Sequence, residues 1–185
     1  MIDQPLATRA PRPLQLRTLT PDDAEAVARH AAADLEHLRV HLRWPEPASV
    51  PAGAREWLEL YARGDDGRVV VAGVLDSDEI VGGALLLHYD AEMATVELGC
   101  WAGSSVQGLG VARAACAALI AYARAELGVE RIEWRCTTVN TRSRALAERL
   151  GFRHEGTLRS DFVMRGERYD SHVLSLVGAE IDAVS

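Results

Sequence analysis

The sequence predicts a mixed α+β domain in which a twisted, mostly antiparallel sheet of six or seven strands is flanked by about four helices. Three observations support this prediction. The chain has 185 residues, of which 48% are hydrophobic and 25% charged, so one domain can bury a core of its own. Its middle section consists of apolar runs separated by short turns, as in an antiparallel meander. Its second half contains a strand–helix–strand unit, whose two strands must pair in parallel.

The N-terminal segment 1–13 contains three prolines and few apolar residues, and we interpret it as an extended arm. The domain is expected over 14–178, followed by a short C-terminal tail at 179–185. Residues 14–17 alternate between apolar and polar side chains, which predicts the first strand.

Two helices are expected before the meander. The segment 21–38 predicts the first, because its apolar residues recur at helical spacing and Pro21 suits the first helical position. The second is predicted over 52–63, where Trp57 lies on the apolar side and is interpreted as part of the core.

The meander consists of apolar runs at 68–75, 79–89 and 93–101. An alanine-rich helix over 109–127 follows, and then a strand over 131–138, which we expect to pair in parallel with the last strand of the meander. The remaining elements are one helix and two strands that form a hairpin, near 141–150, 152–158 and 171–177.

Composition excludes several classes of function. All 20 basic residues are arginine, so the chain has neither a Schiff-base lysine nor a Walker A lysine. The net charge of -7 argues against general nucleic-acid binding, which requires a basic surface. Neither an apolar run long enough to span a bilayer nor a signal-peptide pattern is present, so we expect no membrane partner and a cytoplasmic location.

The side chains that usually bind metals lack the necessary spacing. The chain contains no C-x-x-C pattern, because its three cysteines are Cys100, Cys116 and Cys136. Its six histidines form no H-E-x-x-H pattern. We therefore expect no metal, and we interpret the three cysteines as small core residues.

A glycine-bearing turn joins the strand at 93–101 to the long helix. The first amides of a helix have no internal partner, and the helix dipole places positive charge there. Gly108 and Gly110 remove side chains from this turn, so a phosphate can approach the amides closely. The turn therefore predicts a pyrophosphate site that needs no lysine. An ordinary helix start is the alternative interpretation.

The segment Gln107-x-x-Gly110-x-Ala112 resembles the acyl-CoA pyrophosphate motif, Q/R-x-x-G-x-G/A, of the GNAT superfamily of N-acyltransferases. The order of the predicted elements is also similar to theirs. A second pattern, N-x-x-S-…-G-F-…-E-G from Asn140 to Gly156, resembles the RimJ/RimL group, the ribosomal-protein N-terminal acetyltransferases and their relatives. The resemblance is strongest over about 93–177.

This resemblance implies that acyl-CoA lies in a V-shaped gap, where the two parallel strands splay apart. Pantetheine would pair with the end of the first strand, and the pyrophosphate would lie on the amides of the glycine turn. The implied cofactor-binding residues are Leu98, Gly99, Cys100, Trp101, Gln107, Gly108, Leu109, Gly110, Val111, Ala112, Asn140 and Ser143.

The resemblance also implies the catalytic residues. Glu97 is the first candidate for the base that takes a proton from the amine, and Ser143 the candidate donor to the leaving thiolate. Asp161 is an alternative base, although Phe162 stands at the closest match to the family's loop carboxylate. Glu97 can instead face solvent or pair with an arginine. Ser143 can bond locally to backbone, and Asn140 can simply cap a helix.

The leading functional hypothesis is an N-acyltransferase that moves an acetyl group from acetyl-CoA to a primary amine by direct attack in a ternary complex. The acceptor is a protein N-terminal α-amine or a small-molecule amine, and Trp44 and Asp161 are expected to contact it. Succinyl or another acyl group is an open alternative, and a homodimer is expected. The hypothesis from a different class is a non-catalytic acyl-CoA-binding module on the same fold.

Overall fold

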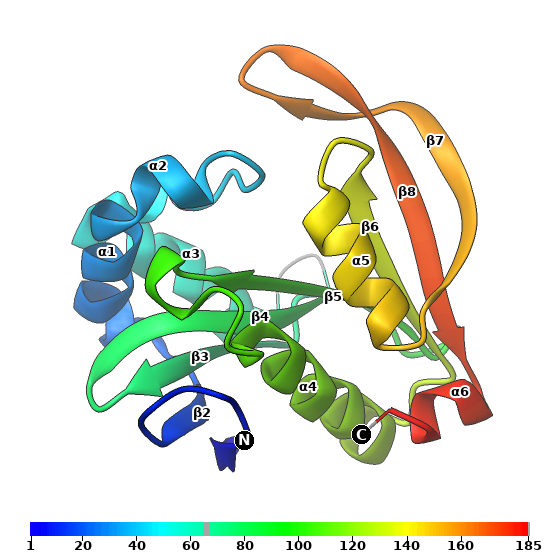
Figure 1. The fold of residues 1–185 in the computed structure, drawn as a ribbon, viewed down its shortest axis with the longest axis horizontal. Coiled ribbons are helices and arrows are strands. Elements are labelled where there is room, and N and C mark those ends of the chain that lie inside the picture. Colours follow the sequence, from blue (N-terminus) through cyan, green and yellow to red (C-terminus); the bar gives the residue numbers. More distant parts are fainter. Residues whose placement is uncertain (65–66, 185) are drawn as a thin grey trace.

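Figure 1 shows one continuous sheet with helices against both faces, in a computed structural model that describes residues 1–64 and 67–184. The strands are β1 (Asp3–Leu6), β2 (Leu14–Thr18), β3 (Val70–Asp76), β4 (Glu79–Asp90), β5 (Thr95–Ala102), β6 (Arg131–Thr137), β7 (Arg153–Met164) and β8 (Glu167–Val177). The helices are α1 (Ala24–Ala33), α2 (Leu35–Leu38), α3 (Pro51–Arg63), α4 (Val111–Leu127), α5 (Thr141–Arg149) and α6 (Ala179–Asp182).

The strand order is β1-β2-β3-β4-β5-β6-β8-β7. Neighbouring strands are antiparallel throughout this order except for β5 and β6, which are parallel. The structure therefore confirms the predicted mixed α+β fold and its one parallel pair. The connection through α4 makes this pairing possible, because parallel strands need a long crossover.

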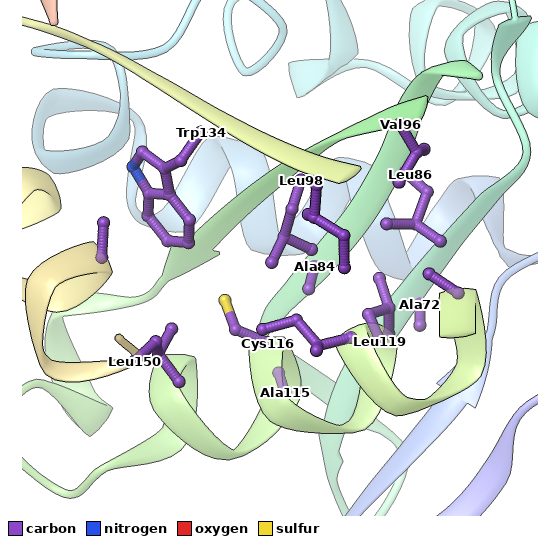
Figure 2. Close-up of a cluster of buried hydrophobic side chains, with 14 of the residues drawn as sticks. Ala72, Ala84, Leu86, Val96, Leu98, Ala115, Cys116, Leu119, Trp134 and Leu150 are labelled. Atoms are coloured by element: carbon purple, nitrogen blue, oxygen red, sulfur yellow. The ribbon is translucent and has the colours of Figure 1, made fainter. Parts of the chain in front are cut away.

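The central strands of the sheet are covered on both faces. On one face, Cys116 and Leu119 of α4 point toward Leu86 and Leu98 of the strands, and all four side chains are buried (Figure 2). Helices α1 and α3 cover the opposite face, where Trp101 belongs to a second core cluster. Apolar packing on both faces holds the central strands in place and thereby fixes the position of their ends.

Alternation along β5 determines which face each of its side chains reaches. Val96 and Leu98 enter the α4 core, so Glu97, Gly99 and Trp101 lie on the face covered by α1 and α3. A charged side chain of β5 therefore lies beside an aromatic cluster rather than in the α4 core.

The helix predicted over 21–38 is divided. It consists of a 3-10 turn followed by α1 and α2, with Asp34 between the two helices at φ -120° and ψ 20°. The Asp34 carboxylate accepts a hydrogen bond from the Ser104 backbone N–H (2.5 Å). The break thus anchors the segment that leads into α4.

The long helix predicted from residue 109 begins instead at Val111. Gly110 has a φ of 82°, which lies in the left-handed region and cannot continue a right-handed helix. Gly108 is also left-handed, with a φ of 73°, so the chain makes a separate turn before the helix starts.

The sheet has one strand more than predicted, because the arm contains β1. This strand pairs with β2 from Asp3↔Arg17 to Leu6↔Leu14 and forms one edge of the sheet. Pro5 is tolerated there because an edge strand leaves half of its backbone groups unpaired. The predicted tail also contains structure, the short helix α6.

The strands of the final hairpin are longer than predicted. The register of β7 with β8 is irregular between Leu158 and Phe162, where Ser160 adopts a φ of 54°. This bulge interrupts the alternation of side chains between the two faces of β7, so the strand continues beyond the end predicted from the sequence. Beyond it the hairpin continues and projects past the rest of the sheet (Figure 1). None of the described helices is long and apolar enough to cross a membrane.

Candidate active site

The parallel pair β5–β6 is short. It extends only from Thr95↔Arg131 to Glu97↔Glu133, after which β5 stays with β4 and β6 stays with β8 (Figure 1). The segment 98–102 therefore has no β6 residue opposite it. Such a free strand edge can accept an extended chain through main-chain hydrogen bonds.

The predicted binding residues of this segment contribute mainly backbone to the gap. Leu98 is 1% exposed and Trp101 is 3% exposed, and they pack into opposite cores. Cys100 is partly buried against the α4 core, and Gly99 has no side chain. The edge therefore presents mainly main-chain atoms rather than side chains.

The glycine turn lies next along the chain and leads into α4. A Cβ added at Gly108 or at Gly110 would meet no atom within 4 Å. These glycines are therefore required by their positive φ and not by internal packing, and the space beside them is open. No side chain caps α4, so the amides of Val111 and Ala112 lie at the positive end of its dipole. The turn has the properties of an anion site.

Gln107 connects the two sides of the gap. Its amide nitrogen lies 2.9 Å from Nε2 of His37 in α2, and its Oε1 accepts a hydrogen bond from Arg142 of α5 (3.0 Å). Gln107 was predicted as a binding residue from the sequence, whereas His37 and Arg142 were not. Both partners are distant from Gln107 in sequence. His37 belongs to no motif, and Arg142 stands at an unspecified position of the Asn140-x-x-Ser143 pattern.

The start of α5 holds two predicted residues. Asn140 caps this helix by accepting a hydrogen bond from the Ser143 N–H (3.1 Å), as the local interpretation of Asn140 predicted. The Ser143 hydroxyl oxygen accepts from the indole N–H of the buried Trp134 (2.9 Å). The same hydroxyl also contacts the Cys136 thiol: burial raises the pKa of Cys136, and the hydrogen bond with Ser143 opposes that rise.

Glu97 is the last residue of β5 that pairs with β6, at the point where these two strands begin to diverge. Its side chain is 18% exposed, and its Oε2 lies 3.6 Å from Nε of Arg135. Burial raises the pKa of Glu97 to about 7 against the opposing effect of Arg135, and the charges of Glu133 and Asp161 raise it further. The carboxyl group can therefore gain or lose a proton near neutral pH, although it also has the arginine partner that the alternative interpretation expected.

Asp161 reaches the same region from the hairpin. It is exposed, and its charge contributes to the raised pKa of Glu97, which places the two carboxylates near each other. The adjacent Phe162 ring lies under the guanidinium of Arg43 at 4.6 Å. This contact connects the hairpin to the loop after α2, on the other side of the diverging strands.

Three tryptophans form a cluster on the Glu97 face. Trp44 stacks on Trp57, with ring centroids 4.6 Å apart, and meets Trp101 edge-on at 5.2 Å. The Trp44 indole nitrogen is buried without a hydrogen-bond partner among the described residues. Trp57 was predicted to belong to the core. It packs against the second core cluster, and its ring also stacks on that of Trp44. Helical periodicity places Trp57 on the apolar side of its helix. It does not reveal that Trp57 is only partly buried or that it lies beside Trp44.

The three cysteines are free, and two of them, Cys116 and Cys136, are buried. Within residues 1–64 and 67–184, no group of three His, Cys, Asp or Glu side chains is placed to hold a metal ion.

Comparison with known proteins shows which family the chain belongs to. Residues 13–153, well over half of the chain, match the family described as acetyltransferase (GNAT) domain. The chain belongs to the GNAT acetyltransferase family. The predicted enzyme class is thereby confirmed.

Individual relatives agree with the predicted group within the GNAT family. The chain is 31% identical over 172 residues to "Putative ribosomal N-acetyltransferase YdaF" of Bacillus subtilis (strain 168), covering 90% of this chain and 92% of the relative. RimJ of Mycobacterium smegmatis, solved in complex with CoA-disulfide, is 26% identical with a TM-score of 0.83, and the match covers 98% of this chain and 90% of that one.

A further solved structure supports the fold alone. RimL, described as a ribosomal alpha-N-protein acetyltransferase in complex with coenzyme A, has a TM-score of 0.81 at 20% identity, covering 96% of this chain and 99% of that one. Together with the sequence relatives, these matches confirm the resemblance of this GNAT protein to the RimJ/RimL group.

Proposed function

We propose that this GNAT protein transfers an acetyl group from acetyl-CoA to the α-amine of a protein N-terminus. The observation that carries the proposal is the three-residue pairing of β5 with β6, which leaves an open strand edge leading to an uncapped helix start with two left-handed glycines. RimJ and RimL, which are solved with bound CoA, support the cosubstrate, and the descriptions of YdaF and RimL as ribosomal acetyltransferases support the class of acceptor.

Acyl-CoA would be held by three parts of the chain. The amides of Gly108, Gly110, Val111 and Ala112 would bind its diphosphate at the positive end of α4, whereas the Leu109 N–H already donates to the Val106 carbonyl (3.3 Å). The backbone of residues 98–101 would pair with the pantetheine arm. The thioester would then lie between Glu97 of β5 and Ser143 of α5, which flank the point where the strands separate.

In the proposed reaction, the amine nitrogen forms a bond to the thioester carbonyl carbon, and the carbon–sulfur bond breaks. The Glu97 carboxylate accepts the proton that the amine loses, directly or through one water. The Ser143 hydroxyl donates a proton to the departing sulfur and regains one through water from the protonated Glu97, and the bond from Trp134 keeps the oxygen in place. Holding both reactants together supplies a further part of the acceleration.

The pKa of Glu97 favours an α-amine over a lysine side chain as acceptor. An α-amine has a pKa of about 7.7–8.0, whereas a lysine amine has a pKa of about 10.4. A base with a pKa of about 7 can therefore deprotonate an α-amine at much smaller cost. The partly buried Trp44 and Trp57 would pack against the first residues of the acceptor, near Asp161.

A cytoplasmic location and a homodimer belong to the same proposal and stay predictions. The transferred group is proposed to be acetyl; repeating the assay below with succinyl-CoA in place of acetyl-CoA tests the alternative acyl group.

The proposal predicts thiol release with one class of amine. The protein is incubated with acetyl-CoA and a lysine-free peptide with a free α-amine, and compared with a lysine-containing peptide whose α-amine is blocked, a polyamine and an amino sugar. We expect free CoA thiol and an acetylated peptide only for the free α-amine. Release only with the other amines would overturn the proposed acceptor. Tight CoA binding without thiol release for any amine would instead identify a binding module.

A further inference from the structure

The N-terminal arm reaches the glycine turn from the edge of the sheet. The arm is anchored by β1 and by the Ile2 N–H, which donates to Oγ1 of Thr18 (2.9 Å). Further along, the Arg9 backbone N–H donates to the Leu109 carbonyl (2.9 Å), and the Arg9 guanidinium donates to the Gly108 carbonyl (2.6 Å). A residue 99 positions away thus contacts the turn at two adjacent carbonyls.

The charge of Arg9 is not neutralised by this contact. Its partner is an uncharged carbonyl, and no carboxylate within residues 1–64 and 67–184 lies within 4.0 Å of its guanidinium. Arg12, in the same arm, instead lies 3.8 Å from the carboxylate of Asp76. The Arg9 side chain is exposed and uses one of five N–H donors, so the others face solvent.

Anchoring the arm does not require this charge. The backbone bond to Leu109 would remain with any side chain other than proline, and a neutral amide could donate to Gly108 equally well. A cation beside an anion site has a specific use, because guanidinium groups bind phosphate oxygens through two parallel bonds.

A second arginine shows the same arrangement on the neighbouring residue of the turn. Arg142 of α5 donates to the uncharged Oε1 of Gln107, and it too has no carboxylate partner among the described residues. In a protein with a net charge of -7 and no lysine, these two cations give the turn a local positive charge.

We infer that Arg9 binds a phosphate group of acyl-CoA, so that the N-terminal arm is part of the cosubstrate site. The inference rests on the proposed function. The arm lies before residues 13–153, so this group would come from outside the segment that matches the family. The phosphate is either the diphosphate on the turn or the phosphomonoester on the ribose, and dephospho-CoA, which lacks the latter, distinguishes them.

The test measures binding of CoA and of dephospho-CoA by calorimetry to the full-length protein and its variants at low salt. Arg9→Gln is expected to weaken CoA binding about tenfold, because one charge-assisted contact is lost. Arg12→Gln is the matched control from the same arm and should leave the affinity unchanged. Arg9→Lys restores the charge and should recover part of the loss, and high salt should reduce the difference.

Each outcome distinguishes between the possible roles of Arg9. A loss for CoA but not for dephospho-CoA would assign Arg9 to the ribose phosphate, and an equal loss for both would assign it to the diphosphate. Unchanged affinity of Arg9→Gln for both ligands would overturn the inference while leaving the proposed function intact. If the wild-type protein bound neither ligand, the proposed function itself would be wrong.

Discussion

Replacing Glu97 with glutamine is expected to lower kcat about a hundredfold while leaving the affinity for acetyl-CoA nearly unchanged. The amide has the shape of the acid but cannot take a proton from the amine. In the wild-type protein kcat/KM should rise with pH through about 7, because the pKa of Glu97 is raised to about 7 and only its ionised form is a base. This rise should disappear in the variant, leaving only the rise at about 7.7–8.0 that comes from deprotonation of the free α-amine itself. The measurement is steady-state kinetics across pH with a free α-amine peptide.

Two neighbouring carboxylates serve as controls. The charges of Glu133 and Asp161 raise the pKa of Glu97, so Glu133→Gln and Asp161→Asn should each move the rise in kcat/KM to lower pH without removing it. If Asp161→Asn abolished the rise and Glu97→Gln did not, Asp161 would be the base. An unchanged kcat in Glu97→Gln at every pH would remove Glu97 from the chemistry.

Gly110→Glu is expected to weaken CoA binding at least about a hundredfold, because a carboxylate would occupy the open space beside the amides that bind the diphosphate. The side chain meets no protein atom at its Cβ, so the cost to folding is limited to the left-handed φ, about 1–2 kcal/mol. Calorimetric titration with CoA and thermal unfolding measure the two effects separately.

Gly128→Glu is the matched control for that substitution. Gly128 lies at the other end of α4, has a φ of 64°, and also leaves open space at the Cβ position. The two variants therefore share the charge and the backbone strain but differ in distance from the turn. Equal CoA affinity of Gly110→Glu and Gly128→Glu would show that the turn does not hold the diphosphate.

Most of the fold could be predicted because its elements have clear periods and clear ends. The meander and the alanine-rich helix differ in hydrophobic period, and glycine follows the end of α4 and of α3. The missed strand, β1, contains Pro5 in a proline-rich segment, and only its position at a sheet edge makes that residue compatible with a strand. That position depends on tertiary structure.

The candidate site was predictable where it is local in sequence. The turn from Gln107 to Ala112 and the start of α5 are short segments whose own spacing suggests their chemistry. The pKa of Glu97 depends instead on burial and then on charges from β6 and β7, and Arg9 meets the turn only through folding. No spacing rule along the chain reports such contacts, so the contacts of Arg9 and Arg142 with the turn, and that of Trp57 with Trp44, were found only in the structure.

A crystal structure with bound CoA tests the central claim most directly. The account predicts the diphosphate on the amides between Gly108 and Ala112, the pantetheine along residues 98–101, and the sulfur near the Ser143 hydroxyl. A CoA molecule bound elsewhere, with the glycine turn closed over by the protein's own side chains, would contradict it.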